Sequence, residues 1–445
     1  MQSVADGDSD DLGKFVRVIR ADRLLELGVA RFGGLDQHRM LLVVLYRTLP
    51  PVDGTARREN VDARGEPAAD QSIGEALGCS AIGQIGKDQQ RFHAGASIAY
   101  SSEMHRVTVL PSKLQFEVED GESVLTAALR QGYILPYGCK SGACSTCKGK
   151  LVEGRVDYGV YQKKALPDFE REQGKALFCQ AKPLSDLVIE ARTIGAAKGI
   201  QIKTLPCRVH KMERVADDVI VLQLKLPANE RLTYLAGQFL EFLLRDGSRR
   251  SFSMGSPPHN AELLELHVRH VAGGQFTDHV FGKMKERDIL RFEGPLGTFF
   301  LREDSAKPIV LVASGTGFAP IKAVIEQAFH DRVMRPMTLY WGGRRPKDLY
   351  MNELAQRWAS EHPDFRYVPV ISDALAEDAW GGRTGFVHRA VMEDFPDLSA
   401  YQVYACGVPI MVDSARRDFI AHCKLPEDEF YADSFTTQAD VAGVT

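Results

Sequence analysis

The chain has 445 residues, of which 44% are hydrophobic and 26% are charged, and its formal net charge is −4. This composition is typical of a soluble globular protein, and at about 150 residues per domain the length suggests about three domains. The charge provides no basic field that would recruit nucleic acid, and the densest apolar run, residues 40–46, is far shorter than the roughly 20 residues that span a bilayer.

Residues 1–103 contain no motif that carries chemistry. The stretch 49–72 is rich in Pro, Gly, Asp and Arg and has neither helical nor strand periodicity. We therefore predict a disordered extension, or a start codon placed too early, for residues 1–103. The acidic, polar beginning does not resemble an export signal. This favours a cytoplasmic protein, in which clustered cysteines are more often metal ligands than disulfides.

A regular pattern begins at Met104. The stretches 105–110 and 114–120 alternate apolar and polar residues, as half-buried strands do. An apolar helical face follows in residues 124–129, and Gly132 is a plausible stop. With a further strand at 184–192, these elements predict a small α+β domain over residues 104–196.

This domain contains four cysteines in a distinctive order. Cys139, Cys144 and Cys147 are spaced C-x4-C-x2-C, and Cys179 follows after 31 intervening residues. That spacing is the plant-type [2Fe–2S] pattern, in which each iron takes two thiolates. Structural zinc is the main alternative, but zinc sites favour two C-x2-C pairs and only one is present. The spacing predicts one [2Fe–2S] cluster.

Residues 197–302 are rich in predicted strands. Candidate strands lie at 219–226, 237–244, 250–254 and 262–271, and turn residues separate them. Short strands at regular spacing predict a closed antiparallel barrel.

Residues 303–445 alternate strands with helices, which predicts a doubly wound parallel sheet. The first apolar strand runs into Gly315-Thr316-Gly317, and Pro320 lies at the start of a helix. Glycines let a backbone approach a pyrophosphate, and a helix N-terminus adds positive potential. We expect this loop to hold a dinucleotide.

Taken together, residues 104–196 resemble a plant-type ferredoxin domain, and 104–435 resemble the ferredoxin–NAD(P)H reductase flavoproteins. The likeness is strongest to reductases of the CDP-6-deoxy-Δ3,4-glucoseen type and to reductase components of oxygenases such as phenol hydroxylase. It depends on "LPYGCKSGACSTCKGKLVEGRVDYG" and "ALFCQAKPLSDLVIE". The resemblance implies a β-grasp ferredoxin domain, an antiparallel flavin-binding barrel and a doubly wound nucleotide domain.

The resemblance also implies a flavin site. "RRSFS" matches the family pattern Arg-x-Tyr-Ser/Thr, so Arg250 would pair with the flavin diphosphate and Ser253 would bond the flavin edge. Phe252 stands where the family usually has Tyr and would stack on the ring. The family's cofactor is FAD rather than FMN. Further FAD contacts are expected at His267, Val268, Gly273, Gly274, Gln275 and Thr277.

At the nucleotide domain, the element "YACGVPIMV" matches a family motif that lies near the nicotinamide. Cys406 would act there, and Phe435 would cover the flavin where the nicotinamide enters. Contacts to NADH or NADPH are expected at Gly315, Thr316, Gly317, Pro320, Arg344, Gly407, Pro409 and Met411.

The implied activity is electron transfer from NAD(P)H through FAD and the [2Fe–2S] cluster to a separate partner protein. That partner would be an oxygenase component or a dehydrase of deoxysugar synthesis. The alternative is a non-enzymatic iron–sulfur redox sensor or an electron-storage ferredoxin.

Overall fold

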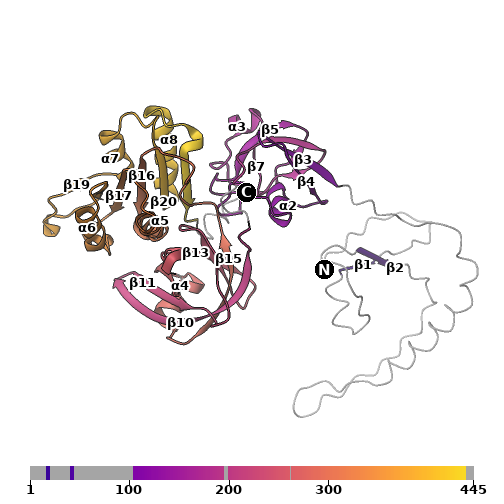
Figure 1. Cartoon of the computed structure of the whole chain (residues 1–445). Helices are drawn as coiled ribbons and strands as arrows, with labels where there is room; N and C mark the ends of the chain where they lie inside the picture. Colours follow the sequence, from indigo (N-terminus) through magenta and orange to yellow (C-terminus); the bar gives the residue numbers. More distant parts are fainter. Residues whose placement is uncertain (1–16, 21–40, 45–103, 195–198, 261, 437–445) are drawn as a thin grey trace, which may run out of the picture. The chain divides into compact units, whose positions relative to one another are not determined.

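The computed structural model describes residues 17–20, 41–44, 104–194, 199–260 and 262–436 (Figure 1). The chain divides into two units, Met1–Ile98 and Ala99–Thr445. In the first unit, β1 (Arg17–Arg20) pairs antiparallel with β2 (Leu41–Val44). Apart from these two strands, the prediction of a disordered extension concerns residues outside the described ranges.

The second unit begins with a five-stranded sheet in the order β4-β3-β9-β5-β7. Its strands β3 and β9 are parallel, and its other pairs are antiparallel. Helix α2 (Val124–Arg130) buries its apolar face on this sheet, and the Ser123 hydroxyl accepts a hydrogen bond from the Thr126 amide to cap it. The predicted β-grasp domain is confirmed. The elements are β3 (His105–Leu110), β4 (Leu114–Val118), β5 (Lys148–Glu153), β6 (Val156–Asp157), α3 (Asp168–Glu172), β7 (Lys175–Leu177), β8 (Lys182–Pro183) and β9 (Leu187–Glu190).

The next sheet has six antiparallel strands in the order β13-β12-β15-β10-β11-β14. A bridge between Met254, directly after β13, and Leu266 of β14 joins its two ends. The barrel therefore closes through a single bridge rather than through a continuous ladder. The elements are β10 (Lys203–Ala216), β11 (Val219–Lys225), β12 (Phe239–Leu243), β13 (Arg249–Ser253), η2 (Pro258–Asn260), β14 (Leu264–Arg269), α4 (Gln275–Gly282) and β15 (Ile289–Leu296).

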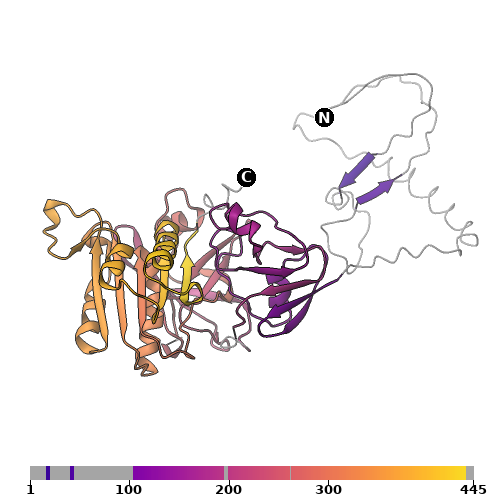
Figure 2. The ribbon, with the colours of Figure 1, turned by 90° about the horizontal axis from the view of Figure 1, so that it is seen from above.

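The last sheet is parallel throughout, in the order β19-β18-β17-β16-β20-β21. Because neighbouring residues of β17 point to opposite faces of the sheet, Trp341 packs in the hydrophobic core on one face and Tyr340 in the core on the other. Helices α5 and α6 cover the Trp341 face and α7 and α8 the Tyr340 face, which confirms the doubly wound sheet (Figures 1 and 2). The strands are β16 (Ile309–Ser314), β17 (Met337–Gly343), β18 (Phe365–Ile371), β19 (Arg383–Thr384), β20 (Gln402–Gly407) and β21 (Phe430–Ser434). The helices are η3 (Gly315–Gly317), α5 (Phe318–His330), η4 (Pro346–Asp348), α6 (Asn352–Glu361), η5 (Ala376–Asp378), α7 (Val387–Asp394), α8 (Pro409–His422) and η6 (Glu427–Glu429).

Within the described residues, no helix has both the length and the apolar character that crossing a membrane requires.

Candidate functional site

The cysteine loop, residues 138–147, wraps tightly between α2 and β5. Lys140, Gly142 and Ser145 adopt positive φ angles of 56°, 72° and 61°. At Gly142 a side chain would also collide with neighbours, since a Cβ would lie 2.9 Å from the Val160 carbonyl oxygen and 2.9 Å from Tyr161 Cβ. Only glycine combines that φ with that lack of space.

Backbone amides of the loop point at its sulfur atoms. The amides of Ser141 and Ala143 each donate to Cys139 Sγ at 3.4 Å, and the Cys139 amide donates to Cys144 Sγ at 3.4 Å. Such donors stabilise negative charge on sulfur, as the thiolate ligands of an iron–sulfur cluster require.

The four thiols form two pairs. Cys144 lowers the pKa of Cys139 to about 5 by hydrogen bonding, and Cys147 lowers the pKa of Cys179 in the same way. Within the described residues, no three His, Cys, Asp or Glu side chains surround a point suited to a single metal ion. A [2Fe–2S] cluster makes a different demand, because each iron takes two thiolates. The two pairs and the amide donors fit that cluster.

Strand β13 carries the predicted flavin contacts. Phe252 is half-buried, and its ring lies 5.9 Å from that of Phe242 and 5.1 Å from that of Phe276, centroid to centroid. Since Phe276 lies in the first turn of α4, these rings bring the start of α4 next to β13. Among the described residues, the guanidinium of Arg250 hydrogen-bonds only to the Arg249 carbonyl, at 2.8 Å, so its other donors are available for a diphosphate.

Two glycines, Gly273 and Gly274, come directly before the first residue of α4. Gly273 has a φ of 77°, and Gly274, the N-cap, has no room for a Cβ, which would lie 2.6 Å from Thr277 Oγ1. The Thr277 hydroxyl donates to the Val271 carbonyl and accepts from the Val271 amide, so it holds this turn together. Gln275 is exposed. The free amides at this helix start suit an anionic group.

Two further residues that were predicted to contact FAD, Val268 and His267, have side chains that are buried in other contacts. The Val268 side chain is fully buried in the barrel core. The His267 ring is also buried, and its two nitrogens lie 2.9 Å from Glu265 Oε1 and 2.8 Å from the Tyr350 hydroxyl. Its side chain is therefore engaged between the barrel and the parallel-sheet domain, and burial, the larger effect, lowers its pKa.

The glycine loop after β16 packs tightly on the loop after β20. A Cβ on Gly317 would lie 2.2 Å from the Cys406 carbonyl oxygen, and one on Gly407, whose φ is 137°, would lie 2.2 Å from Ser314 Oγ. The Ser314 hydroxyl also accepts a hydrogen bond from the Val408 amide at 3.1 Å. The structure thus joins the two predicted nucleotide motifs at the carboxyl edge of the sheet, where ligands of such sheets bind.

Arg269, which the sequence reasoning missed, reaches this loop from the barrel. A Cβ on Gly315 would lie 3.3 Å from the Arg269 guanidinium carbon. Its Nε and one terminal nitrogen are shielded from solvent without a hydrogen bond among the described residues, although Nε lies 3.4 Å from Asp218 Oδ2. A guanidinium beside a glycine loop at a helix start is suited to bind a pyrophosphate.

The remaining predicted nucleotide contacts are spread more widely. Thr316 and Pro320 are buried at the start of α5, and Pro409 is the first residue of α8. Met411 packs in the core beneath α8 rather than at the loops. The Arg344 side chain is exposed.

Asp433 is the second residue that the sequence reasoning missed. Its Oδ2 accepts a 2.8 Å hydrogen bond from the Ser253 hydroxyl and lies 3.9 Å from Cys406 Sγ. Burial raises the pKa of Asp433 to about 6, and burial likewise raises that of Cys406. Phe435 follows two residues later, and its amide donates to the Gly407 carbonyl at 2.8 Å. Ser253 and Cys406 therefore meet at one buried carboxyl, and Phe435 is hydrogen-bonded to Gly407, the residue after Cys406.

The cysteine loop lies close to this carboxyl group. The charge of Cys139 contributes to the raised pKa of Asp433. Lys140 Nζ lies 3.5 Å from Glu241 Oε2 of β12, and Tyr137 is hydrogen-bonded to Thr298, which follows β15. The cysteine loop is therefore fixed against the barrel near Ser253.

Three family models match the chain. A 2Fe-2S iron-sulfur cluster binding domain matches residues 107–184, an oxidoreductase FAD-binding domain matches 206–301 and an oxidoreductase NAD-binding domain matches 311–417.

Whole relatives match over the same region. The CDP-6-deoxy-L-threo-D-glycero-4-hexulose-3-dehydrase reductase of Yersinia pseudotuberculosis is 40% identical over 74% of this chain and 98% of its own length. The phenol 2-monooxygenase reductase component DmpP of a Pseudomonas strain is 36% identical over 76% of this chain and 96% of its own. The crystal structure of the Amycolatopsis cytochrome P450 reductase GcoB is 33% identical, covers 75% of this chain and 99% of that one, and has a TM-score of 0.61.

Proposed function

We propose a role in electron transfer for individual residues of this chain. The chain belongs to the ferredoxin–NAD(P)H reductase family, in the branch with an N-terminal [2Fe–2S] domain. It is an oxidoreductase with FAD, NAD and [2Fe–2S] domains. Bound FAD supplies the conversion of a two-electron hydride into single electrons, which an iron–sulfur cluster can accept. The protein provides binding, orientation and electrostatics.

In this proposal, Cys139, Cys144, Cys147 and Cys179 hold the cluster. Arg250 and the start of α4 at Gly273 and Gly274 bind the FAD diphosphate, and Phe252 and Ser253 face the flavin ring. Gly315 and Gly317 hold the pyrophosphate of the nicotinamide nucleotide, and Arg269 contributes to it from the barrel. Cys406, Gly407 and Phe435 line the nicotinamide position.

One observation supports these assignments above all. The hydrogen bond from Ser253 to Asp433 links the proposed flavin strand to β21, and Asp433 pairs in register with Cys406 on the neighbouring β20. Hydride transfer needs the two rings in contact, and this junction lies where the barrel and the parallel-sheet domain meet. Asp433 would hold a proton at its carboxyl group, and Ser253 would orient its hydroxyl between that group and the flavin.

Anaerobic stopped-flow spectroscopy tests the order of transfer. On mixing with NADH, flavin absorbance should fall first and cluster absorbance second. Cys406→Ala should keep both cofactors and slow only the first phase. Cluster reduction that precedes flavin reduction, or an unchanged first phase in Cys406→Ala, would show that the roles are misassigned.

The electron acceptor is a separate protein, an oxygenase or dehydrase component like those that the relatives serve. These relatives are reductase components, so a redox sensor or an electron-storage ferredoxin is not supported. We propose a cytoplasmic location, since a reducing compartment keeps the cysteine ligands as thiols. Cell fractionation tests this.

We also propose the domain boundaries 104–196, 197–302 and 303–445, preceded by the extension 1–103. The family models lie inside the three domains. A variant that begins at Met104 should keep full NADH-dependent reduction of cytochrome c. A large loss of cofactor or activity would show that residues 1–103 are needed.

A further inference from the structure

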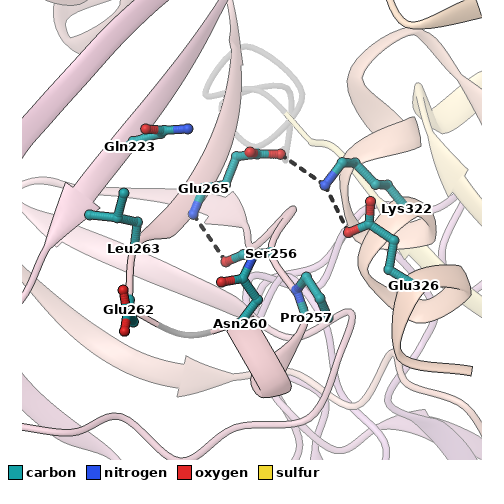
Figure 3. A pocket seen from close by; sticks show the side chains of 9 residues that line it. All are labelled: Gln223, Ser256, Pro257, Asn260, Glu262, Leu263, Glu265, Lys322 and Glu326. Carbon is teal, nitrogen blue, oxygen red and sulfur yellow. Dashed lines mark hydrogen bonds and ion pairs between the residues drawn. The ribbon is translucent and has the colours of Figure 1, made fainter. Parts of the chain in front are cut away.

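Helix α5 carries a charged side chain into the contact between the parallel sheet and the barrel. The Lys322 side chain is only 9% exposed, and its Nζ lies 3.1 Å from Glu265 Oε1 of β14 and 3.1 Å from the Gly255 carbonyl oxygen. Glu326, one turn later on the same helix, contributes a third contact at 2.9 Å. Figure 3 shows the ammonium group between the two carboxylates. All three hydrogens of the ammonium therefore have acceptors.

Glu265 is itself fixed by further contacts. Its carboxylate lies 2.9 Å from His267 Nε2, and its amide donates to Ser256 Oγ at 3.1 Å. The other ring nitrogen of His267 lies 2.8 Å from the Tyr350 hydroxyl. Although burial opposes ionisation, His267 and Lys322 lower the pKa of Glu265 to about 2, so the carboxyl is charged at neutral pH.

These contacts connect the two halves of the hydride-transfer site. Lys322 lies in the first turns of α5, directly after the Gly315–Gly317 loop. Gly255 lies two residues after Ser253, the residue that bonds Asp433. Lys322 thereby ties the helix that begins at the nucleotide loop to the segment that ends the flavin strand.

The surroundings of Lys322 are not filled by apolar packing. A cavity of about 210 Å³ lies beside it, and its walls are largely polar. Its lining includes Gln223, Asn260 and Glu262 (Figure 3). Outside this ion pair, the same stretch of barrel contacts α5 through exposed groups, such as His259 Nδ1 with Gln327 Oε1 at 2.8 Å. Beside the ion pair, α5 also packs on the barrel through the small apolar cluster of Ala236, Ala323 and Val324. The buried ion pair is therefore the charged part of a contact that also contains apolar packing.

We propose that Lys322 and Glu265 form an interdomain clamp that sets the distance between the nicotinamide and the flavin. This inference rests on the proposed function and assigns Lys322 and Glu265 as positioning residues, because neither contacts the reacting atoms. Removing one member of a buried ion pair leaves the other charge uncompensated, so the domains would shift to solvate it. A misplacement of about 1 Å can cost on the order of 100-fold in rate.

The test measures hydride transfer in the holoenzyme. In Lys322→Met, anaerobic flavin reduction by NADH should slow at least tenfold, and the isotope effect with 4-deuterated NADH should rise. The charge-transfer absorbance between reduced flavin and NAD⁺ should weaken, because it depends on ring contact. Transfer from chemically reduced flavin to the cluster should keep the parent rate.

Matched variants separate positioning from folding. Glu326→Gln keeps both cross-domain contacts of Lys322 and should behave like the parent. Glu265→Asp keeps the charge but shortens its reach, and should slow hydride transfer while cofactor content and thermal midpoint stay close to those of the parent. The exchange Lys322→Glu with Glu265→Lys should recover part of the rate lost in Lys322→Met.

The clamp is wrong if Lys322→Met and Glu265→Asp both reduce flavin within twofold of the parent rate with an unchanged isotope effect and charge-transfer band. A parent protein whose flavin NADH does not reduce would instead overturn the proposed function. The two failures are therefore distinguishable.

Discussion

Thr298 and Tyr137 are joined by three hydrogen bonds across the contact between the barrel and the β-grasp domain. The Tyr137 amide donates to Thr298 Oγ1 at 3.0 Å, the Thr298 hydroxyl donates to the Tyr137 carbonyl at 3.0 Å, and the Thr298 amide donates to the same carbonyl at 3.2 Å. The Arg302 guanidinium donates a further hydrogen bond to the Thr298 carbonyl, at 2.9 Å. Because Tyr137 lies two residues before Cys139, this contact fixes the position of the cysteine loop.

Thr298→Val should therefore slow transfer from flavin to cluster. The variant keeps the shape of the side chain but leaves the buried Tyr137 amide without its acceptor, which costs about 1–3 kcal/mol of stability. In anaerobic stopped flow, the cluster phase should slow while flavin reduction by NADH stays at the parent rate. Thr298→Ser, which keeps the hydroxyl, is the control, and equal cluster phases in all three proteins would contradict the prediction.

The cluster assignment has its own test. The purified protein should be red-brown and contain about two irons and two sulfides per chain, because four thiolates hold one [2Fe–2S] cluster. Cys144→Ser should remove the visible absorption of the cluster and keep the flavin. Cys423→Ser, which changes a cysteine in the core below α8, is the matched control and should keep both. Zinc in place of iron after anaerobic purification would overturn the assignment.

The sequence predicted the three-domain architecture and the cysteine cluster because each depends on local signals. The spacing of Cys139, Cys144 and Cys147 lies within nine residues, and strand and helix periodicity is equally local. Asp433 has no such signal. It becomes part of the site only because β21 pairs in parallel with β20 and Ser253 approaches from the barrel, 180 residues away in sequence.

For Arg269 and His267 too, the sequence could not predict which part of the protein each side chain would contact. Both lie on β14, and the family resemblance pointed to His267. Alternation along a strand places these two side chains on the same face, but it does not say that this face meets the next domain. The position of α5 decides this, since the Arg269 guanidinium lies against Gly315 and the His267 ring lies under Tyr350.

Arg250→Ala should weaken FAD binding by roughly ten- to a hundredfold, since charge-assisted contacts to a diphosphate are worth about 1.5–3 kcal/mol. Equilibrium titration of the flavin-free protein with FAD measures this, and the cluster spectrum should stay intact. Arg249→Ala is the matched control, because Arg249 pairs with Glu241 and Glu293 at 3.2 and 3.0 Å. It should retain FAD much better than Arg250→Ala. Equal losses in the two variants would remove Arg250 from the site.

Asp433→Asn should change how stability depends on pH. Burial raises the pKa of the Asp433 carboxyl to about 6 from the ordinary 3.8, although the Ser253 hydrogen bond opposes the rise. The folded state therefore binds the proton more tightly than the unfolded state does. The resulting stabilisation is full below pH 3.8 and is lost as the pH rises through about 6.

Between pH 5 and 7, the parent should therefore lose about 1 kcal/mol of stability relative to Asp433→Asn, which cannot ionise. Thermal midpoints of the two holoproteins, measured in steps from pH 5 to 8, should diverge up to about pH 6.5 and then run parallel. Ser253→Ala should strengthen the effect, since it removes the hydrogen bond that favours the ionised carboxylate. A parent and an Asn variant whose midpoints differ by the same amount at every pH would show that Asp433 is ionised throughout this range, and it could then not hold a proton beside the flavin.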